Sequence, residues 1–211
     1  MENLIFWRKL AVNVLLSALL GAPLAASAWQ QQTASVQPAY QSFEQLRHQA
    51  GQGNAQAQND LGWMYEQGLG VRQNYAAALE WFDKAAAQGN APAQNNLGMM
   101  YLEGRGVQRD YTAAVEWFRK AADQGDAPAQ SNLGAMYEQG LGVQQDYTAA
   151  LEWFRKAANQ GFALAQYNLG VMYDEGRGVR QDLQQARYWW EKAAAQGYQQ
   201  AIINLNFLNG R

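Results

Sequence analysis

Apolar residues follow a helical spacing along most of the chain, and the pattern repeats every 36 residues. Within residues 90–125, apolar positions recur at steps of three, four and one in two segments, which is typical of amphipathic helices. A Leu-Gly pair marks each repeat, at Leu61-Gly62, Leu97-Gly98, Leu133-Gly134 and Leu169-Gly170. A fixed period of this length predicts a stack of similar supersecondary units.

Capping residues predict where the two helices of a unit begin and end. Asn90 is a good N-cap for a first helix, helix A, over 91–103, and Gly104 suits the left-handed conformation at its end. Asp110 caps a second helix, helix B, which runs to about 124, and Gly125 ends it. Two such helices joined by a short loop form an αα-hairpin.

These hairpins predict an all-α fold, a right-handed α-solenoid in which neighbouring units bury each other's apolar stripes. Residues 42–208 form this solenoid, preceded by a polar linker over 29–41. Its parts are a lone B-like half-repeat, four full repeats and a closing A-like helix, at 42–53, 54–89, 90–125, 126–161, 162–197 and 198–208.

The repeated glycine inside helix A predicts a close contact between helices. Glycine costs about 1 kcal/mol against alanine within a helix, so its return in four units suggests that a neighbour leaves no room for a side chain. In the closing helix Asn206 stands at the same position, and no helix B follows it. The neighbour of Gly98 is therefore expected to be helix B of its own unit.

The first 28 residues resemble a secretory signal. Arg8 and Lys9 precede an apolar run over 10–20, and a small-x-small site ends at Ala28. The run is shorter than the roughly 20 apolar residues of a spanning helix. We expect cleavage after Ala28, export, a periplasmic location and no stable membrane span afterwards. A retained membrane anchor is the alternative.

Composition narrows the possible functions. Removing 1–28 changes the formal net charge from −2 to about −3, which offers little attraction to nucleic acid. The chain has no cysteine and only one histidine, His48, so a thiol nucleophile and an ordinary zinc site are excluded. No Gly-x-Ser-x-Gly or Ser-x-x-Lys motif is present. We expect no enzymatic activity, no cofactor and no metal.

The unit also resembles a known family. Its consensus is A-x-A-Q-x-x-L-G-x-M-Y, a Gly-x-Gly-Val loop, and D-Y-x-x-A-x-x-W-F-x-K-A-A-x-Q-G. This is similar to the Sel1-like repeat, a subclass of tetratricopeptide-like repeats. The resemblance implies an adaptor that gathers other proteins. Cysteine-rich exported members with reported penicillin-binding or β-lactamase activity carry a disulfide in each unit, and this chain has none.

Positions that differ between units indicate where a partner binds. On helix A these are 56, 59, 63 and 66 and their equivalents at 36-residue steps, which share one helical face. In tetratricopeptide-like stacks helix A lines the concave side, so this face is expected to form a groove. The predicted partner-binding residues are Trp63, Asn95, Met99, Leu102, Leu164, Tyr167 and Val171. Some of them could instead be half-buried against the next unit.

Arginines after helix A offer a second candidate surface. Arg72, Arg105, Arg109, Arg177 and Arg180 are expected along one rim, either meeting an acidic partner or as ordinary solvated charges.

The sequence is compatible with three functions. The leading hypothesis is a periplasmic protein–protein interaction scaffold that binds a protein or peptide in the helix-A groove. The first alternative is an immunity-type protein that neutralises a toxin acting in the periplasm. The last is a β-lactamase-like enzyme or a cell-wall hydrolase, for which no catalytic constellation is visible in the sequence.

Overall fold

The computed structural model describes residues 43–209, which form ten α-helices and no strand. The expected signal and linker, residues 1–28 and 29–41, lie outside the described residues. The helices are α4 (Phe43–Gly51), α5 (Ala55–Gln67), α6 (Tyr75–Ala87), α7 (Ala91–Glu103), α8 (Tyr111–Asp123), α9 (Ala127–Gln139), α10 (Tyr147–Asn159), α11 (Ala163–Glu175), α12 (Leu183–Ala195) and α13 (Gln199–Asn209).

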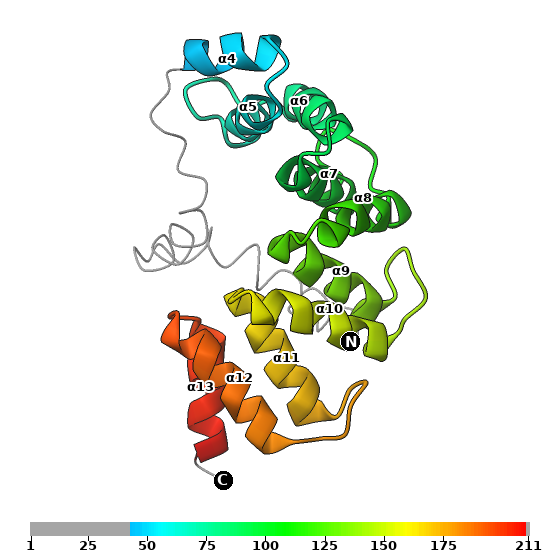
Figure 1. Ribbon diagram of the computed structural model, residues 1–211, viewed down its shortest axis with the longest axis vertical. Helices are drawn as coiled ribbons and strands as arrows, with labels where there is room; N and C mark the ends of the chain where they lie inside the picture. The colour runs from blue at the N-terminus through cyan, green and yellow to red at the C-terminus, as the bar shows by residue number, and fades with distance from the viewer. Residues whose placement is uncertain (1–42, 210–211) are drawn as a thin grey trace. The chain divides into compact units, whose positions relative to one another are not determined.

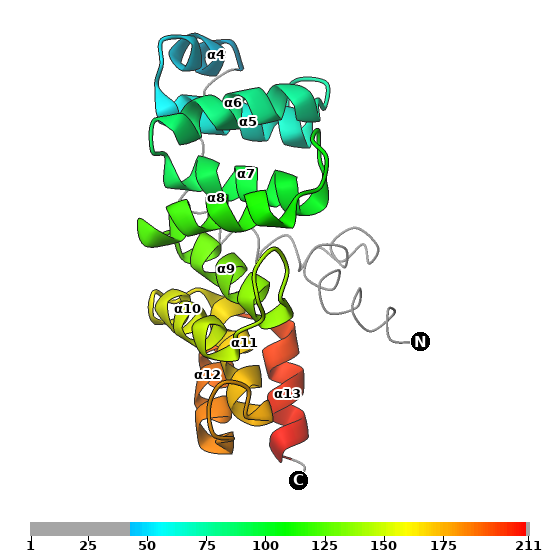
Figure 2. The same cartoon turned by 90° about the vertical axis from the view of Figure 1, so that its right-hand side faces the viewer.

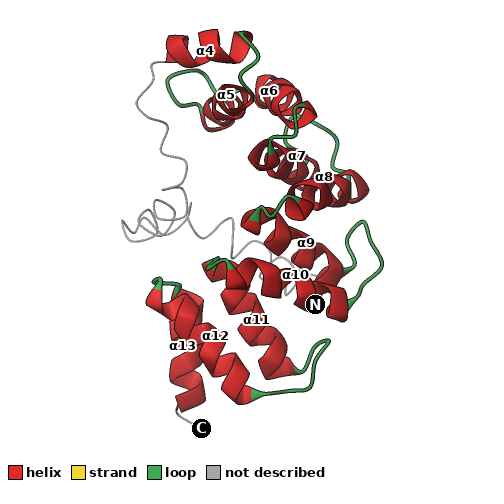
Figure 3. Cartoon of the chain, viewed as in Figure 1, coloured by secondary structure: helices red, strands yellow, loops and turns green. Residues whose placement is uncertain are grey.

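The ten helices stack as hairpins in chain order (Figures 1 and 3). The A helices are α5, α7, α9 and α11, and each is followed by its B helix, α6, α8, α10 or α12. A lone B-type helix, α4, precedes them, and a lone A-type helix, α13, follows them. The expected all-α solenoid of stacked hairpins is confirmed.

The predicted caps form the ends of these helices. The Asn90 side chain accepts a hydrogen bond from the backbone N–H of Ala93, and the Asp110 carboxylate accepts one from Ala113. Gly104 ends α7 in the left-handed conformation, with φ 73°. The fourth unit departs from the pattern, because Phe162 precedes α11 and makes no side-chain cap.

The core lies between units, where helix B of one unit packs against helix A of the next. Phe82 of α6, for example, shares a buried cluster with Leu97 and Met100 of α7. Phe118 and Phe154 take the place of Phe82 in later units and are fully buried. Each interface therefore buries the apolar stripes of two neighbouring hairpins, and Figure 2 shows these hairpins following one another along the stack.

The glycine inside helix A contacts helix B of its own unit, as the sequence predicts. A Cβ atom on Gly98 would lie 2.5 Å from ring atoms of Phe118 in α8. Gly62 and Gly134 face Phe82 and Phe154 in the same way, and Gly170 faces Trp190. The two helices of a hairpin approach too closely for any side chain at this position.

The second glycine of the loop serves a different contact in the second, third and fourth units, where it connects neighbouring units. A Cβ atom on Gly142 would collide with the carbonyl oxygen of Tyr111, at the start of the preceding unit's helix B. Gly178 meets Tyr147 similarly. The Gly-x-Gly loop thus ends helix A with its first glycine and packs on the previous hairpin with its second.

Candidate partner-binding face

The A helices lie side by side and form one surface, which we call the A-helix face. It consists of the side chains at 56, 59, 63 and 66 of α5 and their described equivalents in α7, α9, α11 and α13. Asparagines connect neighbouring helices across it. Asn96 donates to the side-chain oxygen of Asn59 at 3.0 Å, and Asn132 donates to that of Asn95 at 2.9 Å.

The residues predicted in the first two units differ in exposure. Trp63 is 36% exposed, whereas Met99 and Leu102 are half-buried and pack against the cluster between α8 and α9. Asn95 is half-buried and accepts the hydrogen bond from Asn132, whose amide also lies 3.6 Å from the Met99 sulfur. Trp63 is the large apolar side chain of α5 that a partner could reach most readily.

The three residues predicted in the fourth unit lie near the last helix. Leu164, Tyr167 and Val171 are half-buried, and the last two pack against the cluster between α12 and α13. The Tyr167 ring lies 5.1 Å from that of Tyr198, centroid to centroid, and its hydroxyl is hydrogen-bonded to Asn204. Burial raises the pKa of Tyr167 above its ordinary value.

The expectation that all four variable positions point to solvent is wrong for three residues. Asn59, Glu66 and Ser131 are buried, with 3%, 8% and 1% of their surfaces exposed. The reason is that the next unit covers these positions: Asn59 bonds Asn96, and Glu66 bonds Arg105. Part of the variation between units therefore tunes contacts within the stack.

The expected arginine rim is also corrected for two of its members. Arg105 donates to Glu66 at 2.9 Å and also pairs with Glu103, while Arg177 donates to Glu138 at 2.7 Å. Both arginines are half-buried and link the end of one helix A to the loop of the next unit. Burial raises the pKa of Glu103, and the Arg105 charge counteracts that shift.

These ion pairs alternate with an apolar contact along the stack. The position of Glu66 holds Leu102 in the second unit, and the position of Arg105 holds Leu141 in the third. Both leucines are half-buried against the same cluster between α8 and α9. At this position an ion pair therefore joins the first unit to the second, a pair of leucines lies between the second and the third, and another ion pair joins the third to the fourth.

The recurring glutamines form a relay that the sequence analysis did not anticipate. Gln124, at the end of α8, donates to Gln94 of α7 at 2.7 Å, and Gln94 donates to the carbonyl oxygen of Ala86 in α6. The relay connects three successive helices and recurs in all four units. The sequence contains a signal for this network, because a glutamine recurs at the same place within the apolar pattern of every unit. A polar residue in such a place indicates a buried hydrogen bond.

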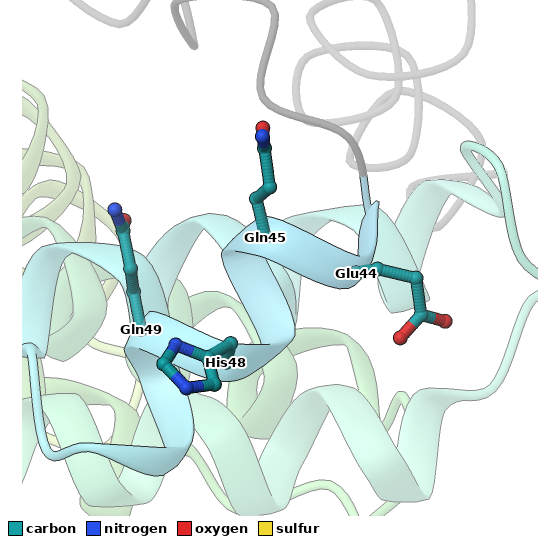
Figure 4. A pocket seen from close by; sticks show the side chains of 4 residues that line it. All are labelled: Glu44, Gln45, His48 and Gln49. Atoms are coloured by element: carbon teal, nitrogen blue, oxygen red, sulfur yellow. The ribbon is translucent and has the colours of Figure 1, made fainter.

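A hollow of about 460 Å³ lies beside α4 and does not have the character of a built site. Its lining residues are Glu44, Gln45, His48 and Gln49. Figure 4 shows that the two glutamines point to one side of the helix, while His48 and Glu44 point elsewhere. The four side chains do not converge on a common point, so His48 has no partner group there that could orient it for catalysis.

The described residues offer neither a metal site nor a membrane-spanning helix. In 43–209 no three His, Asp or Glu side chains gather closely enough to hold a metal ion. None of α4 to α13 is long and apolar enough to cross a membrane.

Comparisons with known proteins agree with this architecture. The family model of the Sel1 repeat matches residues 55–90, 91–126, 127–162 and 163–198. A Sel1 repeat protein from Oxalobacter formigenes is 36% identical with a TM-score of 0.73, covering 87% of this chain and 72% of that one. No curated protein sequence matches the chain.

Two other solved structures are similar to the chain. A protective antigen of uropathogenic Escherichia coli with an SLR fold is 43% identical with a TM-score of 0.75 over 79% of this chain. The match spans only 36% of the antigen's length. An immunity protein of Pseudomonas aeruginosa is 23% identical with a TM-score of 0.56, covering 85% of this chain and 69% of that one, which shows a shared fold alone. Because four consecutive repeats match over more than half of its length, the chain belongs to the Sel1 repeat family.

Proposed function

We propose that this chain is a scaffold that binds another protein or a peptide on its A-helix face. The observation that carries the proposal is the division of residues between units. Repeated apolar residues, such as Phe82 and Phe118, are buried, while the varied positions of helix A lie on one face, where most of them are exposed or half-buried. A stack held together by its repeated residues can change the remaining ones to suit a partner.

The character of the face supports a macromolecular partner over a small molecule. Trp63 is exposed in α5, and at the other end Ile203 and Phe207 of α13 are 55% and 64% exposed. Large exposed apolar side chains are the usual anchors of protein interfaces. They lie at opposite ends of the stack of A helices, and an extended peptide or a protein surface could contact both.

The periplasmic location and the immunity-type role remain predictions. The first depends on residues 1–28. The second has support only from fold likeness to proteins named immunity proteins, at 22–23% identity. A periplasmic toxin that the purified chain inhibits one to one would favour the immunity role over a general scaffold.

The proposal is tested by affinity capture from a periplasmic extract with the wild-type chain and two single variants. Trp63→Ala removes the exposed anchor of α5. Tyr188→Ala is the matched control, because Tyr188 is an aromatic residue on α12 with 47% exposure. We expect the true partner to be lost with Trp63→Ala and retained with Tyr188→Ala. Equal capture by all three proteins would contradict a binding role for this face.

A further inference from the structure

The position of Glu66 and Glu138 on the A-helix face is taken by Asp174 in the fourth unit. Arg105 reaches back to Glu66 and Arg177 reaches back to Glu138, each from 39 residues further along the chain. No described residue stands 39 residues beyond Asp174, because the described chain ends at Asn209. Asp174 is thus the carboxylate of this series that receives no arginine from a following unit within 43–209.

A hollow of about 200 Å³ lies beside Asp174, next to the last residues of α13. It is lined by Asp174 of α11, Trp190 of α12, and Asn204, Phe207 and Leu208 of α13. Asp174 is half-buried, and Phe207 is exposed at the rim. The hollow therefore combines one negative charge with aromatic and apolar walls.

The other polar groups of this hollow are already engaged. The Trp190 indole N–H donates to the Tyr167 carbonyl at 3.2 Å, and the Asn204 side chain is hydrogen-bonded to the Tyr167 hydroxyl. Arg177, in the loop that follows α11, is paired with Glu138 and Glu175. The Asp174 carboxylate is the lining group that remains to accept hydrogen bonds from a ligand.

We propose that this hollow receives an arginine side chain of the bound partner, which takes the role that Arg105 and Arg177 play within the stack. The inference rests on the proposed binding function and specifies the chemistry of the partner at one end of the face. A guanidinium presents several donors in a geometry that matches a carboxylate, so it suits Asp174. The negative formal charge of the chain, −2, also favours a basic partner.

The test uses the full chain labelled with ¹⁵N and a blocked tripeptide, acetyl-Gly-Arg-Gly-amide, as the probe. Its uncharged counterpart carries citrulline, and a third probe carries lysine. We expect the arginine probe to shift the Asn204 side-chain amide and the Trp190 indole resonances. Citrulline should bind at least about tenfold more weakly, because hydrogen bonds to charged groups are markedly stronger than neutral ones. Lysine should fall between the two.

Two variants of the chain test whether the arginine probe binds at Asp174. Asp174→Asn keeps the size of the side chain and should weaken the arginine probe about tenfold. The control, Asp123→Asn, changes an exposed acid on α8 and should leave the affinity unchanged. Equal binding of arginine and citrulline, or full affinity in Asp174→Asn, would overturn the proposal. Binding seen only in an Arg211→Ala variant would also overturn it, by showing that the chain's own last residue fills the hollow.

The two proposals can fail separately. If the captured partner binds Asp174→Asn as tightly as wild type, the arginine site is wrong while the scaffold function stands. If the tripeptide binds at Asp174 but no protein depends on Trp63, the hollow is real and the scaffold proposal fails.

Discussion

The Phe118 ring lies directly against the backbone of Gly98, and this contact joins the two helices of the second hairpin. Gly98→Leu should therefore destabilise the chain by about 1–3 kcal/mol, since the ring cannot withdraw from a packed interface without cost. Asn206→Leu is the matched control, because it places the same residue at the same position of α13, which has no B helix after it within 43–209. Its effect should stay within about 0.5 kcal/mol. Urea unfolding followed by circular dichroism measures both, and an unchanged midpoint for Gly98→Leu would refute the contact.

The glutamine relay predicts a loss of stability from a substitution that leaves the apolar core intact. Gln130 is buried, accepts from Gln160 and donates to the carbonyl oxygen of Ala122. Gln130→Leu removes both of these hydrogen bonds, although the Ala122 carbonyl still accepts from the Gly125 N–H and the Gln160 amide still donates to the Gly125 carbonyl. At about 0.5–1.5 kcal/mol for each lost bond, we expect a cost of about 1–3 kcal/mol. Gln144→Leu, in an exposed loop, is the control. Comparable thermal midpoints for the two variants would show that the relay contributes nothing.

The Glu66–Arg105 pair predicts non-additive effects in a double-mutant cycle. Arg105→Leu leaves the buried Glu66 carboxylate without its donor, so the single variant should lose about 1–3 kcal/mol of unfolding free energy. The double variant Glu66→Leu, Arg105→Leu should recover the part of this loss that comes from Glu66, because the next interface uses Leu102 and Leu141 at the same positions. The part that comes from Glu103, which also pairs with Arg105, should remain. Strictly additive losses would contradict this coupling.

Asp60 predicts a dependence of stability on pH. Burial raises its pKa above the ordinary value of 3.8, although hydrogen bonds from Gln56 and Asn59 oppose the shift. A raised pKa in the folded state means that the ionised carboxylate costs stability above that pKa, and the cost disappears once pH falls below the unfolded value. Asp60→Asn, the residue found at this position in the later units, should therefore be more stable than wild type at pH 7 and equal to it near pH 3.

The measurement for Asp60 is a series of thermal unfolding curves from pH 3 to pH 7. Asp83→Asn, which changes an exposed acid on α6, controls for the general effect of removing one negative charge. An advantage of Asp60→Asn that is constant over this range would rule out titration of Asp60 as its source.

The helices, their caps and the glycine contact could be predicted from the sequence because repetition exposes them. Residues such as Gly98 and Asp110 recur at one place in every unit, so each unit provides an independent test of the same local structure. Phe162 shows the limit of this reasoning, since α11 forms without the side-chain cap of its relatives. Phe162 instead packs against the buried cluster that contains residues of α10 and α11.

Exposure on the A-helix face could not be predicted in the same way. Variation between units was interpreted as contact with solvent, but Asn59 and Ser131 vary and are buried. The Ser131 hydroxyl makes no hydrogen bond within the described structure. The change from asparagine in the first two units to serine in the third is therefore not explained by a hydrogen bond between units. The helical period shows which face of a helix a residue lies on. Whether that residue is buried depends on how closely the next helix packs over it.

The alternation of ion pairs and leucines at the edge of the A-helix face restricts how such an array can grow or shrink. Loss of residues 90–125 alone would place Glu66 opposite Leu141 and leave the Glu66 carboxylate without an arginine. Loss of 90–161 would instead place Glu66 opposite Arg177. We therefore expect the array to tolerate the loss of two hairpins better than the loss of one, because only the former keeps a carboxylate opposite an arginine.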